Sequence, residues 1–98
     1  MRIEYTDVAI HDLIRLRAFI AEHNPQAANK AAAKLTTGIR NLTRQPRLGH
    51  PVMDAPDPEK IRDLILPPYT VRYTLMSQSL LILRIWHHKE GREDESTN

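Results

Sequence analysis

The chain has 98 residues, which is enough for one domain with a single hydrophobic core. A content of 41% hydrophobic and 27% charged residues excludes wholesale disorder, and the absence of cysteine excludes a disulfide framework, a thiolate zinc site and a cysteine nucleophile. The formal net charge is +2, so the chain is mildly basic. Because the longest largely apolar run, residues 80–86, cannot span a bilayer, we expect a soluble, cytoplasmic protein without a membrane partner.

The first half of the chain predicts a short strand and two helices. Residues 2–5 are expected to form the strand, and Thr6 is placed to cap a helix over residues 7–23. Apolar residues recur in that helix at spacings of four, three and four, on one face: Ala9, Leu13, Leu16 and Ile20. An Asn-Pro break at residue 24 ends this helix and starts a second one, expected to reach about residue 44. The two helices should therefore form an antiparallel hairpin.

The second half of the chain predicts a loop followed by strands. Residues 45–59 contain four prolines, which is typical of a loop. Three strands are expected, over residues 61–66, 69–75 and 80–86. The order β-α-α-β-β-β predicts an α+β domain over residues 1–90, with the helical hairpin packed on a small, mostly antiparallel sheet. The polar residues 91–98 are expected to fray.

An ordered set of short motifs makes the chain resemble a known protein family. The motifs are Asp12-Leu13, Asn24-Pro25-Gln26-Ala27-Ala28, Leu42 with Pro46 and Gly49, Arg62-Asp63-Leu64, Pro68-Tyr69-Thr70-Val71-Arg72-Tyr73 and Ile82-Leu83-Arg84-Ile85-Trp86-His87-His88. Together with the element order, they resemble the RelE/ParE toxins of type II toxin–antitoxin systems. The resemblance implies a growth-inhibiting toxin with a role in plasmid stabilisation. It also implies a cognate antitoxin, an acidic and partly flexible protein encoded beside the toxin.

The resemblance leaves the target of the toxin open. ParE-like members inhibit DNA gyrase and turn over no substrate, whereas RelE-like members cleave mRNA in the ribosome. The Asn-Pro-Gln-Ala-Ala break and the ending Arg-Ile-Trp-His-His-Lys-Glu-Gly-Arg-Glu-Asp are closer to the ParE side. We therefore expect a ParE-like inhibitor of DNA gyrase. The alternatives are a RelE-like, ribosome-dependent mRNA endonuclease and a degenerate member that only binds its antitoxin.

The nuclease alternative needs a base, an acid and a cation that stabilises the developing phosphorane. In the RelE-like pattern an arginine follows the tyrosine of the penultimate strand, and Thr70 occupies that position here, which counts against a ribonuclease. A different site stays open, because an imidazole with a pKa near about 6.5 suits proton transfer at neutral pH. Its candidate catalytic residues are His87 or His88 with Arg62, Arg72 and Arg84. Adjacent residues of a strand face opposite ways, so only one of the two histidines can join such a site.

Two binding surfaces are predicted from the helices and the loop that follows them. Ile10, Ile14 and Phe19 lie off the inward face of the first helix and are expected to form an exposed apolar patch that binds the antitoxin. The candidates for binding the target are Arg40, Arg44, Arg47 and Trp86. The bland alternatives are a solvated helix end for the arginines and a core or interface position for the tryptophan. The acidic loop residues form no ordered ligand set, so neither a metal nor a cofactor is expected.

Overall fold

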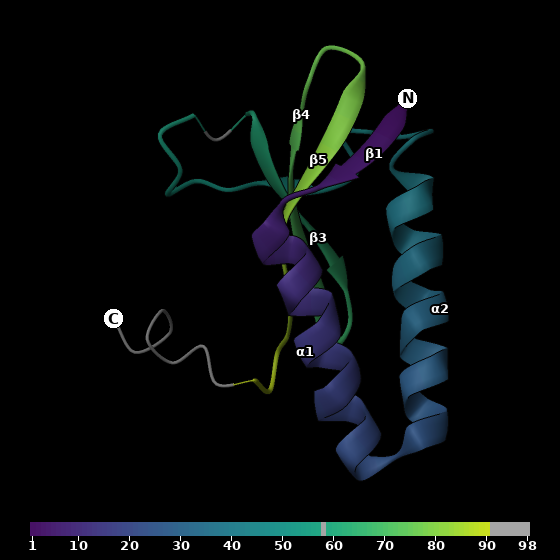
Figure 1. Cartoon of the computed structure of the whole chain (residues 1–98). Coiled ribbons are helices and arrows are strands. Elements are labelled where there is room, and N and C mark those ends of the chain that lie inside the picture. The colour runs from purple at the N-terminus through teal and green to yellow at the C-terminus, as the bar shows by residue number, and fades with distance from the viewer. Residues whose placement is uncertain (58, 91–98) are drawn as a thin grey trace.

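Two helices pack against a five-stranded sheet in the computed structural model, which describes residues 1–57 and 59–90 (Figure 1). The helices are α1 (Asp7–His23) and α2 (Pro25–Asn41). The strands are β1 (Arg2–Tyr5), β2 (His50–Pro51), β3 (Ile61–Leu66), β4 (Tyr69–Leu75) and β5 (Ser79–His87). The predicted α+β fold, a helical hairpin on a small sheet, is confirmed. The predicted polar tail, residues 91–98, lies outside the described residues.

The strands follow the order β1-β5-β4-β3-β2, and every neighbouring pair is antiparallel except β1 and β5. The strand β2 lies in the stretch that was predicted as loop. It pairs with β3 for only two residues, with His50 opposite Asp63 and Pro51 opposite Arg62. A strand of this length within a proline-rich segment shows no periodicity, which is why the sequence does not predict it.

Side-chain caps begin both helices, and tight backbone turns end the second one. The hydroxyl of Thr6 accepts the N–H of Ala9 at 3.0 Å, and the Asn24 side chain caps α2 in the same way. The prediction for the end of α2 is wrong, because the helix stops at Asn41, three residues early. The N–H groups of residues 42–44 bond to carbonyls only three residues before them, as in a 3₁₀ turn, and the chain then enters the loop.

A β-bulge in β5 determines which of its side chains face the helices. Tyr73 pairs with Ile82, whereas its neighbour Arg72 pairs with Arg84, so one residue of β5 has no partner in the register. The bulge allows Ile82 and Ile85, three residues apart, to point into the same core. Both side chains are fully buried. A strand without a bulge would place them on opposite faces of the sheet.

The hydrophobic core lies between the two helices and one face of the sheet. Its buried members come from both helices, the turn after α2 and three strands: Ala9, Leu16, Leu35, Ile39, Leu42, Leu64, Val71, Tyr73, Leu80, Ile82 and Ile85. The helix α2 approaches β3 closely at Gly38, where an added Cβ atom would collide with the Leu66 side chain. Neither helix in the described ranges is long and apolar enough to cross a membrane.

Candidate functional site

The face of the sheet that the helices leave open carries several of the predicted site residues. Arg72 and Arg84 are direct partners across β4 and β5, and so are Thr70 and Trp86. Residues directly opposite each other project from the same face, so these four side chains share it. His88 joins them, because its Nε2 lies 2.8 Å from the hydroxyl of Thr70. We call these five residues the open-face cluster.

Both arginines of the open-face cluster have a fixed acidic partner. Arg72 donates to both carboxylate oxygens of Asp63, at 2.8 and 3.0 Å, and these hydrogen bonds raise the pKa of Arg72. Its guanidinium carbon also lies 5.3 Å from the ring centroid of Trp86, in cation–π geometry. Arg84 extends to α1, where it donates to Asp12 at 2.8 Å. The two cations are therefore neutralised within the protein itself.

Asp12 holds the edge of β5 and was not among the predicted site residues. It is 1% exposed, and its carboxylate accepts the N–H of Ile85 at 2.9 Å together with hydrogen bonds from Arg84 and Arg15. The strand β1 pairs with β5 only as far as Ile82, so Asp12 supplies the acceptor that a strand would otherwise provide. Burial alone would raise the pKa of Asp12. The hydrogen bonds to its carboxylate have the larger combined effect and hold the pKa below its ordinary value.

Glu90 extends this network to the end of the described chain. Arg15 donates to its two carboxylate oxygens at 2.7 and 3.1 Å, and the N–H of His87 donates to it at 2.9 Å. The bonds to Glu90 and Asp12 raise the pKa of Arg15. Burial alone would raise the pKa of Glu90, but its donors lower it. The sequence carries one signal for this network, because Asp12 follows Ala9 by three residues on the inward face of α1.

His87 lies on the helix-covered side of the sheet, away from His88. Its ring packs against Tyr69 and Phe19, with centroids 5.1 and 5.6 Å apart, and its Nδ1 accepts the N–H of Lys89 at 2.9 Å. Burial lowers the pKa of His87, which favours the neutral ring at pH 7. In the described part of the chain, no three His, Asp or Glu side chains are arranged to hold a metal ion.

Arg62 also lies across the sheet from the open-face cluster, where it and Tyr73 hold the loop that follows α2. The Tyr73 hydroxyl donates to the carbonyl of Pro46 at 2.6 Å and accepts the N–H of Gly49 at 2.9 Å. Arg62 is 6% exposed and donates to the carbonyl of Gly49 at 2.8 Å. An added Cβ at Gly49 would lie 2.8 Å from the Tyr73 ring, so only glycine fits there. Of the five candidate catalytic residues, the open face therefore holds Arg72, Arg84 and His88.

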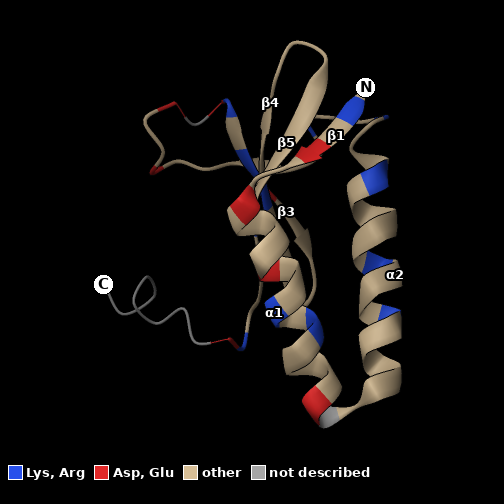
Figure 2. Ribbon diagram, in the orientation of Figure 1, with Lys and Arg blue, Asp and Glu red and all other residues tan. Residues whose placement is uncertain are grey.

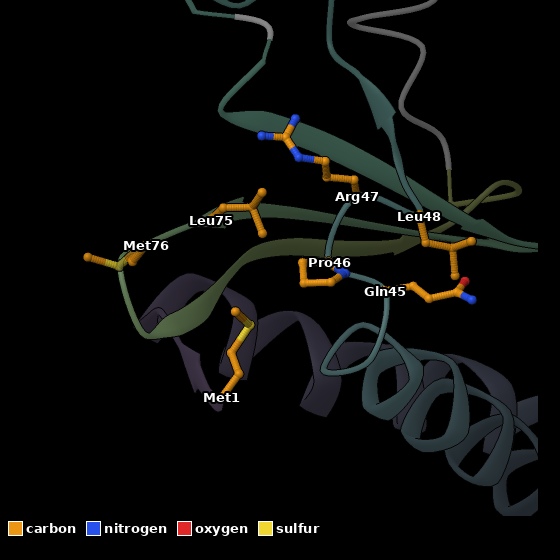
Figure 3. A pocket seen from close by; sticks show the side chains of 7 residues that line it. All are labelled: Met1, Gln45, Pro46, Arg47, Leu48, Leu75 and Met76. Carbon is orange, nitrogen blue, oxygen red and sulfur yellow. The ribbon is translucent and has the colours of Figure 1, made fainter.

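This loop forms one side of an open hollow of about 650 Å³, which we call the loop hollow (Figure 3). Its lining comes from the loop, from the end of β4 with the turn after it, and from the N-terminal residue: Met1, Gln45, Pro46, Arg47, Leu48, Leu75 and Met76. The side chains are mostly apolar, and Leu48 and Met76 are exposed.

The residues predicted to bind the target fall on two separate surfaces. Arg47 lines the loop hollow, and Arg40 and Arg44 are exposed at the end of α2 and in the turn after it. Figure 2 shows Lys and Arg on α2 and no acidic residue there. Trp86 belongs instead to the open-face cluster, toward the end of β5 that is remote from the β4–β5 turn. The structure brings the three arginines to one region and leaves the tryptophan in another.

A second cavity, of about 320 Å³, opens between α1 and α2, and we call it the helix groove. Its lining is largely aliphatic: Tyr5, Leu13, Ile14, Leu16, Arg17, Ile20, Ala28, Ala31, Ala32, Leu35, Thr36 and Ile39. The alanines of α2 are too small to fill the space between the helices. Ile14 borders the groove and is 63% exposed, and Ile10 is exposed one turn earlier. Phe19 packs against His87 instead, so the three predicted antitoxin-binding residues do not form one patch.

Comparison with known proteins finds relatives over most of the chain. The family model described as ParE toxin of type II toxin-antitoxin system, parDE, matches residues 3–91. Two toxins of Caulobacter vibrioides, RelE1 and RelE2, are 31% and 30% identical to the chain over 86% and 88% of its length, and the matches cover 89% and 93% of those toxins. A solved structure described as the chromosomal ParDE TA system from P. aeruginosa superimposes with a TM-score of 0.72 at 23% identity. The superposition covers 89% of this chain and 95% of the solved chain, which shows that the two share a fold.

Proposed function

Because the chain belongs to the ParE toxin family of type II toxin–antitoxin systems, we propose that it arrests growth by binding and inhibiting DNA gyrase. Membership of the family implies a cognate antitoxin that neutralises the toxin. In this proposal the toxin acts as a binding protein, and the bonds broken in the DNA are broken by gyrase. Two features support it, namely the family match and the chemistry of the open-face cluster.

The pairing of both open-face arginines with acids is the observation that carries this proposal. Cleavage of RNA needs a cation that is available to the developing phosphorane. If Arg84 turned to a phosphate, Asp12, which is 1% exposed, would lose one of its two arginine partners, and leaving a buried charge with fewer partners is unfavourable. Arg72 is held by two hydrogen bonds to Asp63, and Thr70 offers only a neutral hydroxyl. This arrangement favours binding over cleavage.

A RelE-like mRNA endonuclease is the second candidate. It is favoured by the identity to the two toxins named RelE and by the exposure of His88 on the open face. In that case the Asp63 carboxylate, released when Arg72 turns to the phosphate, would have to take the 2′-OH proton, and the His88 ring would protonate the leaving 5′ oxygen. This chemistry requires the ion pair to open for each turnover.

Parallel assays with purified toxin separate the two candidates. We expect inhibition of gyrase supercoiling with accumulation of cleaved DNA–gyrase complexes, and intact mRNA on ribosomes. The variant His88→Ala should inhibit gyrase as the unaltered chain does. Cleaved mRNA together with normal supercoiling would establish the alternative, and His88→Ala would then lower the cleavage rate by about 100-fold or more.

We also propose that the cognate antitoxin docks in the helix groove. The groove is aliphatic and bordered by the exposed Ile14, which suits the apolar face of an amphipathic helix. Among the described residues, the groove lining includes the cation Arg17 and no Asp or Glu, which suits an acidic partner. Both properties match the acidic and partly flexible antitoxin that the family implies.

The substitution Ile14→Glu tests this docking site. We expect about tenfold or greater loss of antitoxin affinity, because the change places a charge in an apolar contact. The melting temperature should stay unchanged, since the side chain is 63% exposed. Val8→Glu is the matched control, at a 48% exposed position on α1 outside the groove. Equal antitoxin affinity for the two variants would contradict the assignment.

A further inference from the structure

We infer that the loop hollow is the surface on which the target docks, and that it takes an acidic protein segment bearing apolar side chains. The inference rests on the proposed function, because gyrase is the target that supplies this segment. It assigns target binding to a surface other than the helix groove. It also separates target binding from the open-face cluster, to which Trp86 belongs.

The first argument is the apolar character of the loop hollow. Leu48, Met76 and Met1 are 45%, 49% and 56% exposed, although they line one hollow together. They come from three segments that are far apart in the sequence and line the hollow from different sides (Figure 3). Methionine side chains are unbranched and adapt their shape to a partner. A protein segment with apolar side chains that covers this surface removes apolar area from water, which is favourable in free energy.

The second argument is that the loop is held rigidly from behind. Tyr73 bonds to both Pro46 and Gly49, and Arg62 bonds to the carbonyl of Gly49. These contacts fix the backbone on both sides of Arg47 and Leu48, whose side chains remain exposed. Because the loop is already ordered, binding of a partner costs little conformational entropy in this part of the chain.

The third argument is charge. Residues 40–51, from the last turn of α2 through β2, contain no Asp or Glu and three cations, Arg40, Arg44 and Arg47, whereas the later loop residues 54, 57 and 59 are acidic. Within the described ranges Arg40 and Arg44 make no ion pair, and Arg47 lies 3.6 Å from Glu59 with both side chains largely exposed. This positive surface attracts an acidic partner and repels a second copy of the chain. Nucleic acid would satisfy the charges but would leave the apolar side chains uncovered.

The loop hollow can be altered without touching the antitoxin site. Among the described residues, the hollow and the helix groove have no lining residue in common. A charge introduced at the hollow should therefore weaken target binding and leave antitoxin affinity intact. An effect on the fold is not expected, since Leu48 and Met76 are about half exposed.

The test compares Leu48→Glu and Met76→Glu with Met53→Glu, a control at a 78% exposed methionine outside the hollow. The full chain is purified, and inhibition of gyrase supercoiling, affinity for the antitoxin, affinity for plasmid DNA alone and the melting temperature are measured. We expect both hollow variants to need about tenfold or more protein for half-inhibition of gyrase. The control should inhibit as the unaltered chain does, and all three should bind antitoxin and melt normally.

Full gyrase inhibition by both hollow variants would overturn the inference and leave the proposed function standing. Loss of antitoxin affinity in these variants would also overturn it, because the hollow would then belong to the antitoxin. The same holds for a matching loss of affinity for plasmid DNA alone, which would identify a nucleic-acid surface.

Failure of the unaltered chain to inhibit gyrase would remove the proposed function instead, and growth arrest on induction then tests the hollow by itself. Loss of arrest by Leu48→Glu and Met76→Glu, with arrest kept by Met53→Glu, would support docking of another target at the hollow. Arrest by all three variants would overturn the inference. The two failures are therefore distinguishable.

Discussion

The open face of the sheet and the end of α2 both carry arginines, but their surroundings differ. On the open face, Arg72 and Arg84 each have a carboxylate oxygen at 2.8 Å. At the end of α2, Arg40 and Arg44 have no ion pair within the described residues, and Arg47 lies 3.6 Å from its acid. Arg72 and Arg84, which the sequence suggests as catalytic residues, are thus held in ion pairs within the fold. Arg40 and Arg44, at the end of a helix, keep their charges available to a partner.

Burial explains the contrast. The Asp12 side chain is 2% exposed, so its charge requires the donors around it. The side chains of Arg47 and Glu59 are 72% and 70% exposed, and an ion pair in such a setting contributes about 0–1 kcal/mol. Breaking the contacts of Asp12 is therefore costly, whereas breaking the contact between Arg47 and Glu59 is nearly neutral.

The largest effect is expected from Asp12→Ala. It leaves the N–H of Ile85 without its acceptor and takes the shared acid from Arg84 and Arg15. We expect the free energy of unfolding to fall by about 3 kcal/mol, measured by urea denaturation. This value is at the low end for a buried pair, because the two arginine side chains are 39% and 44% exposed.

Glu4→Ala is the control for Asp12→Ala, since it breaks the surface ion pair between Glu4 and Arg2. We expect it to change the free energy of unfolding by less than about 0.5 kcal/mol. Equal effects of the two substitutions would show that burial does not distinguish the two kinds of pair.

Gly49→Ala should have the next largest effect, because its Cβ would lie 2.8 Å from the Tyr73 ring and 3.0 Å from the backbone of Asp63. Overpacking of this kind costs about 1–3 kcal/mol. We expect a loss in that range by urea denaturation, together with weaker gyrase inhibition as the loop hollow is displaced. Unchanged stability would show that the loop is not held as tightly as its contacts indicate.

Acid should destabilise the fold through the carboxylates of the network around α1. The lowered pKa values of Asp12 and Glu90 mean that the unfolded chain takes up protons first as the pH falls below about 4. The stability that these carboxylates contribute is thus complete above that pH and is lost as the pH falls through their folded values. Glu90→Gln should flatten this dependence in urea titrations below about pH 4. An unchanged pH dependence in this variant would show that Glu90 does not contribute to the stability in the way its contacts indicate.

The smallest effect on stability is expected from the double variant Arg40→Ala with Arg44→Ala. Both side chains are exposed and lack an ion pair in the described structure. We expect the free energy of unfolding to change by less than about 0.5 kcal/mol. A loss above about 1 kcal/mol would give these arginines a structural role and remove the contrast between the two regions.

Local chemistry in the sequence was enough to predict the main elements. Thr6 and Asn24 act within three residues of themselves, so a reader of the sequence can identify them as caps. The period of two in β4 and the apolar face of α1 are likewise properties of one segment. The end of α2 and the strand β2 were not predicted, because backbone turns and a two-residue pairing leave no such pattern.

Only the tertiary structure decided which of the candidate residues meet. The bulge in β5 moves Ile85 to the core face and leaves Arg84 beside Arg72 on the other. The hydrogen bond from Arg84 joins it to Asp12 across 72 residues of sequence, and that from Arg15 to Glu90 spans 75. No local pattern encodes such contacts, because they depend on where separate elements pack. Sequence periodicity determined the helices and strands, and packing determined which charges would be paired.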